Sequence, residues 1–282
     1  TVEYRPNQNY MLYGRISTGH KPGIFNDSWA DDGFGIQRIL PESTVENFEV
    51  GVKGNFFDGK LRVASSVYKM NWDGMQMSLF TPPVAGFEAI SPEVIEHFVS
   101  IPNNELWGFE TEYTYFLTDT LRLFGFYAYS DSAIGDISSV EIGAPSPQFE
   151  FGLLGNGEEG FFQVPTEQTG NSLPSQPSHK FSLSVSKEYE VSALGFLDFI
   201  ASYSYVGSQY QNIWNIDLFE LPSYDRLDFS ATWTSFEGSV SLTVFANNVF
   251  DEIGVIEFMP VSGYGNQRNL GTLTNHREIG VR

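Results

Sequence analysis

The chain has 282 residues, of which 41% are hydrophobic and 16% aromatic, so its composition is that of a folded protein. Its formal charge of −20 argues against a nucleic-acid partner, because phosphate binding needs clustered Lys and Arg. Cysteine is absent, which excludes disulfides, thiolate metal sites and a Cys nucleophile. The aromatic content exceeds what a water-soluble core needs and is typical of aromatic belts at membrane interfaces.

Alternating polar and apolar residues predict β-strands along almost the whole chain. In the stretch RLDFSATWT, for example, Leu227 and Phe229 share one face whereas Asp228 and Ser230 share the other. The ten predicted strands span residues 8–18, 43–57, 61–79, 104–117, 121–131, 178–190, 196–210, 223–236, 239–249 and 274–282. No apolar run is long enough for a transmembrane helix, but most of these strands reach the roughly 9–11 residues that cross a bilayer.

The predicted connections alternate between short and long. Tight turns are predicted at 56–61, 116–121 and 235–240, and long connections at 19–42, 80–103, 132–177, 211–222 and 250–273. Short turns at one end and long loops at the other are typical of an up-and-down outer-membrane barrel. Alternation alone also fits a soluble β-sandwich. The opening stretch TVEYRPNQNYMLYGR is typical of a strand entered in mid-protein, which predicts that the chain is a fragment.

Several segments, in order along the chain, resemble the TonB-dependent outer-membrane receptors. They are LYGRISTGHKPGIFN (12–26), residues 42–76, LWGFETE (106–112), LPSYDRLDFSATW (221–233), FANNVFDE (245–252) and TNHREIGVR (274–282). His20 departs from the family pattern, which usually has an aromatic residue there. The resemblance implies an all-β, antiparallel, up-and-down transmembrane barrel of about 22 strands with a plug domain inside. Residues 1–282 would form the C-terminal portion of that barrel, about ten strands, without the plug.

The resemblance also implies a function. A receptor of this family takes up a scarce nutrient, most often an iron–siderophore complex, across the outer membrane of a Gram-negative bacterium. Its partners would be the TonB system, acting through the plug, outer-membrane lipid and lipopolysaccharide, and a small metal chelate. No enzymatic activity and no cofactor are expected, and no nucleophile elbow occurs. The alternatives are a passive porin-like or fatty-acid channel and a secreted adhesive β-sandwich.

Candidate site residues fall into three groups. Polar residues predicted to face the barrel lumen are Arg15, Glu49, Lys53, Glu110 and Glu112. Glu110 and Glu112 lie two apart on one strand face, as paired carboxylates for acid–base catalysis would, but solvated lumen charges are the favoured explanation. Loop residues that would contact a ligand, or pack loop against loop, are His20, Trp29, Phe34, His97, Trp214 and Tyr264. The strand-end motif comprises Asn247, Asn248, Phe250 and Asp251.

Two further expectations concern metal and charge. The four His residues lack the spacing of metal ligands, so no metal site is predicted. His20 and His97 are expected in long loops. Residues 80–105 and 131–177 carry acidic residues without Lys or Arg, which predicts a negative outer surface. Such a surface would favour a neutral or cationic cargo, or divalent cations that bridge to lipopolysaccharide. It would equally be the acidic surface typical of a salt-adapted organism, or would only keep the loops soluble.

Overall fold

The computed structural model describes residues 1–26, 37–81, 95–139, 149–153, 159–163, 166–191, 194–261 and 268–282. Almost all regular structure in these residues is β-strand, and a short 3-10 helix, η2 (Asp217–Phe219), interrupts one connection. Within the described ranges, no helix is both long and apolar enough to span a membrane. The chain is therefore all-β, as predicted.

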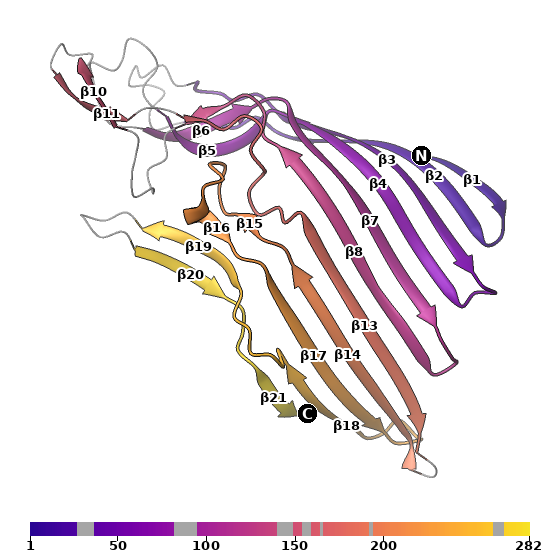
Figure 1. The fold of residues 1–282 in the computed structure, drawn as a ribbon. Coiled ribbons are helices and arrows are strands. Elements are labelled where there is room, and N and C mark those ends of the chain that lie inside the picture. The colour runs from indigo at the N-terminus through magenta and orange to yellow at the C-terminus, as the bar shows by residue number, and fades with distance from the viewer. Residues whose placement is uncertain are drawn as a thin grey trace.

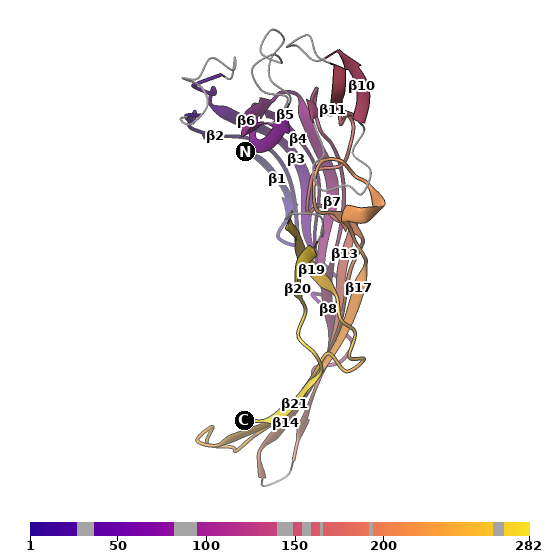
Figure 2. The same cartoon turned by 90° about the vertical axis from the view of Figure 1, so that its left-hand side faces the viewer.

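One large antiparallel sheet dominates the fold (Figure 1). Its eleven strands, in spatial order, are β1 (Val2–Asn7), β2 (Tyr10–Lys21), β3 (Ser43–Phe56), β4 (Leu61–Asp73), β7 (Asn104–Phe116), β8 (Leu121–Ala133), β13 (His179–Glu190), β14 (Phe196–Val206), β17 (Tyr224–Thr234), β18 (Ser241–Asn247) and β21 (Glu278–Val281). Within this sheet, strands that follow one another along the chain are also neighbours in space, which is the predicted up-and-down order. Figure 2 shows the sheet as a curved wall, seen nearly edge-on.

Short turns join the strands at one end of the sheet. The three predicted turns are present, between β3 and β4, β7 and β8, and β17 and β18, and two more join β1 to β2 and β13 to β14. In the β3–β4 turn, Phe57, Asp58 and Gly59 all adopt positive φ values (54°, 57° and 84°), and such left-handed residues reverse the chain within a few positions.

The five long connections lie at the other end, and four of them contain small two-stranded sheets; the described part of 22–42 has an isolated bridge between Phe25 and Ile39 instead. The pairs are β5 (Met75–Thr81) with β6 (Ile95–Ile101), β9 (Ser138–Ser139) with β12 (Thr166–Glu167), β10 (Phe149–Leu153) with β11 (Glu159–Gln163), β15 (Gln209–Tyr210) with β16 (Glu220–Leu221), and β19 (Val255–Val261) with β20 (Arg268–Leu273). In Figure 1 the strands β5, β6, β10 and β11 lie at the end opposite the tight turns.

Three strand predictions need correction. The main sheet has eleven strands rather than ten, because β1 was not predicted. The predicted strand 61–79 is two strands in different sheets, because Gly74, with φ +70°, turns the chain out of the large sheet. The predicted strand 196–210 also divides, since β14 ends at Val206 and β15 pairs with β16 instead.

The two faces of the sheet differ in polarity. Cross-strand partners on one face are apolar, as in the pairs Ile16–Phe48 and Val50–Val67. Ile16 and Val50 are each 65% exposed, so this face has no protein core to cover it. Contiguous apolar exposure on this scale would be unstable in water but is what a lipid-facing wall requires. We call this the outer face, and the opposite, more polar one the inner face.

Candidate functional site

The inner face gathers all five residues that were predicted to face the lumen. Arg15 pairs with Glu49 across β2 and β3, and Lys53 of β3 pairs with Ala64 of β4. Ser66 and Ala64 pair in turn with Glu110 and Glu112 of β7, which places these carboxylates on the same face. The alternation of the strands therefore brings residues that are far apart in sequence onto one polar surface.

Tyr13 is an inner-face residue that the sequence reasoning missed. Its hydroxyl donates a hydrogen bond of 2.5 Å to Glu49 Oε1, and the Lys53 ammonium lies 5.7 Å from its ring centroid. Gly51 makes room for this ring, since a Cβ there would lie 2.5 Å from Tyr13 Cζ. Tyr13 and Arg15 are two positions apart on one strand, and side chains at such positions point to the same face. The alternation could therefore have identified Tyr13 from the position of Arg15.

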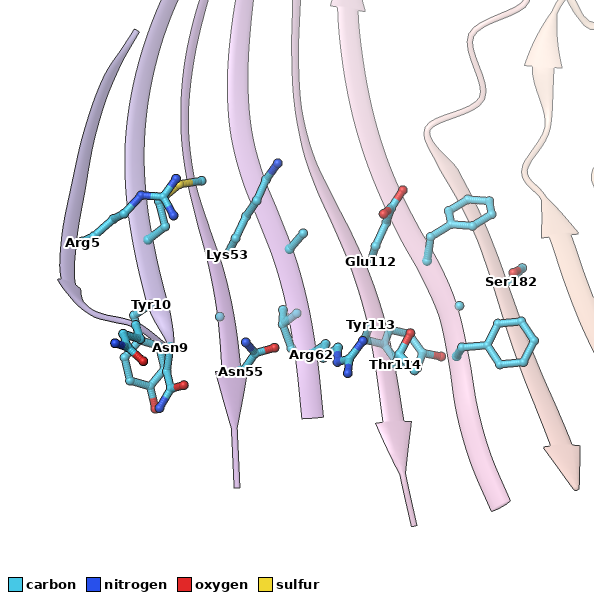
Figure 3. A pocket seen from close by; sticks show the side chains of 18 residues that line it. Arg5, Asn9, Tyr10, Lys53, Asn55, Arg62, Glu112, Tyr113, Thr114 and Ser182 are labelled. Atoms are coloured by element: carbon cyan, nitrogen blue, oxygen red, sulfur yellow. The ribbon is translucent and has the colours of Figure 1, made fainter. Parts of the chain in front are cut away.

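A cavity of about 760 Å³ lies on the inner face near the tight turns (Figure 3). Arg5, Lys53 and Arg62 bring three cations to its lining, and Glu112 brings one carboxylate. Arg5 forms an ion pair of 2.9 Å with Glu3. The residues that line the cavity include no Cys, His or Asp. Its side chains can attract and hydrogen-bond anionic groups in a wet lumen.

The three aromatic and histidine candidates that the structure describes, His20, His97 and Trp214, lie toward the other end of the sheet. His20 lies on β2, opposite Thr44, so the expectation that it belongs to a loop is wrong; its side chain is exposed. His97 lies on β6, where it pairs with Leu79. Trp214 packs against a cluster of buried apolar residues from the long connections. Trp29, Phe34 and Tyr264 lie outside the described residues.

Metal binding finds no support in this part of the molecule. Among the side chains that the structure describes, no group of three or more His, Cys, Asp or Glu could hold an ion. His20 lines a second cavity of about 560 Å³ together with Glu42, Glu46 and Asp73, but these groups do not converge on a common point. Glu110 lies on the inner face between Ser66 and Ala128, and Glu112 lies between Ala64 and Phe126.

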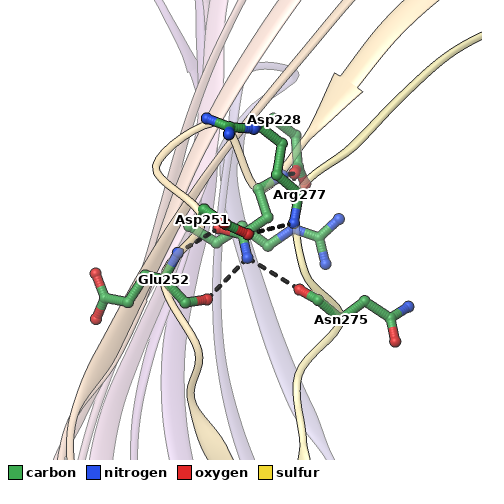
Figure 4. A network of polar contacts seen from close by, with 7 residues as sticks. Asp228, Asp251, Glu252, Asn275 and Arg277 are labelled. Carbon is green, nitrogen blue, oxygen red and sulfur yellow. Dashed lines mark hydrogen bonds and ion pairs between the residues drawn. The ribbon is translucent and has the colours of Figure 1, made fainter.

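The strand-end motif forms a compact polar network at the base of the last long connection (Figure 4). Asn248 is 2% exposed and adopts φ +51°. Its side-chain amide donates to the carbonyls of Glu252 (2.8 Å) and Asn275 (2.9 Å), and its Oδ1 accepts the Glu252 N–H (3.1 Å). Its own N–H donates to Asp228 Oδ1 at 2.8 Å. Asn248 thus joins the two ends of the connection to each other and to β17.

The other motif residues have separate roles. Asp251 Oδ1 accepts the Arg277 N–H at 2.7 Å and lies 3.4 Å from His276 Nδ1. Phe250 is 58% exposed. Asn247 is the last residue of β18 and pairs with Glu278 of β21 on the inner face; its side chain makes no hydrogen bond to the described residues. Among the motif residues, Asn248 and Asp251 therefore make the hydrogen bonds that hold the two ends of the last long connection together.

The pKa values of two adjacent carboxyl groups in this connection, Asp251 and Glu252, are shifted in opposite directions. The Arg277 N–H, and after it His276, lower the pKa of Asp251, because both stabilise the carboxylate. A hydrogen bond with the Asp225 carboxyl, together with desolvation, raises the pKa of Glu252. Asp251 is thus held as an anionic acceptor at the base of the connection, whereas Glu252 takes up a proton more readily beside Asp225.

Comparison with known proteins identifies the fold. Residues 1–249 match the family model described as TonB dependent receptor-like, beta-barrel. Among solved structures, the ferric yersiniabactin uptake receptor FyuA from Yersinia pestis is similar with a TM-score of 0.68 and 14% identity, over 99% of this chain and 35% of that one. The ferric preacinetobactin receptor BauA from Acinetobacter baumannii is similar with a TM-score of 0.63 and 16% identity, over 98% and 34%.

The copper transporter OprC is also similar, with a TM-score of 0.61 and 13% identity, over 98% of this chain and 37% of that one. No curated protein matches the chain. The chain spans about a third of the length of these structures, and at such low identity their likeness establishes the fold alone. Together with the match over residues 1–249, the eleven-stranded up-and-down wall shows that the chain belongs to the TonB-dependent receptor β-barrel family, a family of Gram-negative outer-membrane receptors and transporters.

Proposed function

We propose that residues 1–282 form the C-terminal portion, a single domain, of the barrel of an outer-membrane receptor that takes up an iron–siderophore complex. The observation that carries the proposal is the family match over residues 1–249. Two of the similar structures, FyuA and BauA, are named as receptors of ferric complexes, which favours a ferric cargo here. A polar inner face behind an apolar outer face provides the wet lumen that such uptake needs.

Each part of the chain has a physical role in this proposal. The outer face spans lipid and meets lipopolysaccharide at the end that carries the long connections. Those connections capture the cargo together with His20 at the adjoining end of β2; the candidate contacts within the connections are Trp29, Phe34, His97, Trp214 and Tyr264. The TonB system acts through a plug domain, and the cargo then passes along Arg15, Glu49, Lys53, Glu110 and Glu112. The chain performs no chemistry on the cargo and needs no cofactor.

Growth under iron limitation tests this function. A strain that lacks the intact receptor gene should lose growth on one ferric siderophore and regain it when the gene is restored. Growth that is the same with and without the gene on every ferric siderophore supplied would contradict iron uptake. Deleting TonB in the complemented strain should abolish the benefit as well, because the proposed transport is energised. A benefit that persists without TonB would indicate a passive channel instead.

A further inference from the structure

A hydrophobic core lies beyond the end of the large sheet, where three long connections meet. Its buried members are Met75, Leu79, Ile101, Ile134, Leu173 and Ile213, with Trp72, Met77, Val99, Ile137 and Trp214 packed around them. They come from the connections 74–103, 134–178 and 207–223 and from the adjoining end of β4. Ile101 is 0% exposed and Ile213 1% exposed, as in the interior of a soluble domain. We call this cluster the loop core.

A buried amide joins the first two of these connections. Asn104, 0% exposed, donates to the carbonyls of Trp72 (3.0 Å) and Ile101 (2.8 Å), and its Oδ1 accepts the Gly135 N–H (3.0 Å). The backbones approach so closely that a Cβ on Gly135 would lie 1.6 Å from the Pro102 carbonyl oxygen. No side chain fits there, so the connections 74–103 and 134–178 are in direct backbone contact.

Two asparagines join the second connection to the third. The Asn171 amide donates to the Ile213 carbonyl at 2.8 Å. Asn215 accepts the Ser172 N–H at 2.6 Å and donates back to the Ser172 carbonyl at 3.1 Å. These bonds satisfy backbone groups of one connection with side chains of the other, so separating the two would leave polar groups without partners.

The connection 22–42 is fastened to the same structure. Asn26, 6% exposed, bonds the Phe98 backbone twice, donating to its carbonyl and accepting its N–H, each at 2.9 Å. The Gln76 amide donates to the carbonyls of Pro22 (3.0 Å) and Pro41 (2.9 Å). Both ends of this connection are therefore held against β5 and β6.

We infer that the described parts of these four connections form one cooperative body that is already assembled before any cargo arrives. Independent loops would each have to order their own backbone, at a cost in conformational entropy for every residue that becomes fixed. Here the apolar residues of three connections share one core, and hydrogen bonds hold the fourth against it, so the ordering is shared and local unfolding must expose this core as a whole. A ligand that binds such a body does not have to order its loops first.

Hydrogen exchange of the intact receptor, in detergent and without cargo, tests this inference independently of what the receptor transports. Ile213→Ala leaves a cavity in the loop core. Peptides that cover 95–103 and 166–178 should then exchange at least about tenfold faster, together with those covering 207–223, while peptides covering 61–68 of β4, away from the loop core, remain unchanged. Faster exchange confined to 207–223 would show that the connections are independent and would overturn the inference.

Two further variants keep the test interpretable. Leu218→Ala removes an apolar side chain that is 39% exposed in the same connection, and it should leave the exchange of 95–103 and 166–178 unchanged. Asn171→Ala removes one hydrogen bond between two connections and leaves the apolar side chains of the loop core in place. It replaces Ile213→Ala if the receptor with that substitution does not fold into the membrane. It should increase exchange in both 166–178 and 207–223. An increase in 166–178 alone would contradict a shared body.

Discussion

Val67→Arg should destabilise the protein in the membrane by about 2–4 kcal/mol, because it places a guanidinium at mid-height on the lipid-facing surface. Val67 lies near the middle of β4, between Val50 of β3 and Phe109 of β7, and is 48% exposed on the outer face. In lipid the charge must either lose hydration or draw water and head groups toward it. We expect less folded receptor in the outer membrane and a lower urea midpoint after reconstitution into vesicles.

The control is Ala64→Arg, three residues earlier on the same strand. Ala64 lies on the inner face between Lys53 of β3 and Glu112 of β7, where water and the Glu112 carboxylate accept a cation and water screens it from Lys53. Unfolding titrations of both variants in the same vesicles should place Ala64→Arg close to the parent protein and Val67→Arg well below it. Equal destabilisation of the two variants would mean that the faces were assigned incorrectly.

Asn248→Ala should open the base of the last long connection, with a local cost of about 3 kcal/mol, because buried backbone groups lose their partners. The carbonyls of Glu252 and Asn275 and the N–H of Glu252 all bond to this one side chain. Asn also tolerates the φ of +51° better than Ala does, so the substitution adds backbone strain. Exchange of residues 248–254 and 274–277 should rise sharply.

Asn247→Ala is the matched control, since it alters the neighbouring asparagine on β18. The Asn247 side chain makes no hydrogen bond to the described residues, so its loss should leave exchange at both ends of the connection unchanged. If both variants loosen the connection to the same degree, Asn248 has no special role in fastening it.

Alternation predicted most of the wall because each membrane strand has one lipid face and one wet face along its whole length. β1 was missed, since it is short and contains Pro6. The break at Gly74 was missed for a different reason: Met75 and Leu79 continue to alternate with Gln76 and Ser78, although they enter the loop core instead of lipid. Alternation with a period of two shows that the two faces of a strand lie in different environments. It does not show whether the apolar face meets lipid or a protein core.

The inner-face residues were predictable for the same reason, whereas the contacts of the long connections were not. The inner-face positions of Arg15 and Glu49 follow from the alternation of side chains along each strand and from the pairing of neighbouring strands. By contrast, Asn26 meets Phe98 across 72 positions of sequence, and Asn171 meets Ile213 across 42. No periodic pattern encodes such bonds, because they depend on how irregular segments from different connections pack.

The most direct test of the membrane wall is a nitroxide scan along β13 in the intact receptor, reconstituted into lipid vesicles. Labels at Leu183 and Val185, which are 45% and 36% exposed on the outer face, should be accessible to oxygen and shielded from a water-soluble nickel chelate. Labels at Ser182 and Ser186, on the inner face, should show the reverse. Accessibility without this alternation, or chelate access at Leu183 and Val185, would contradict the assignment of this chain as a lipid-spanning barrel wall.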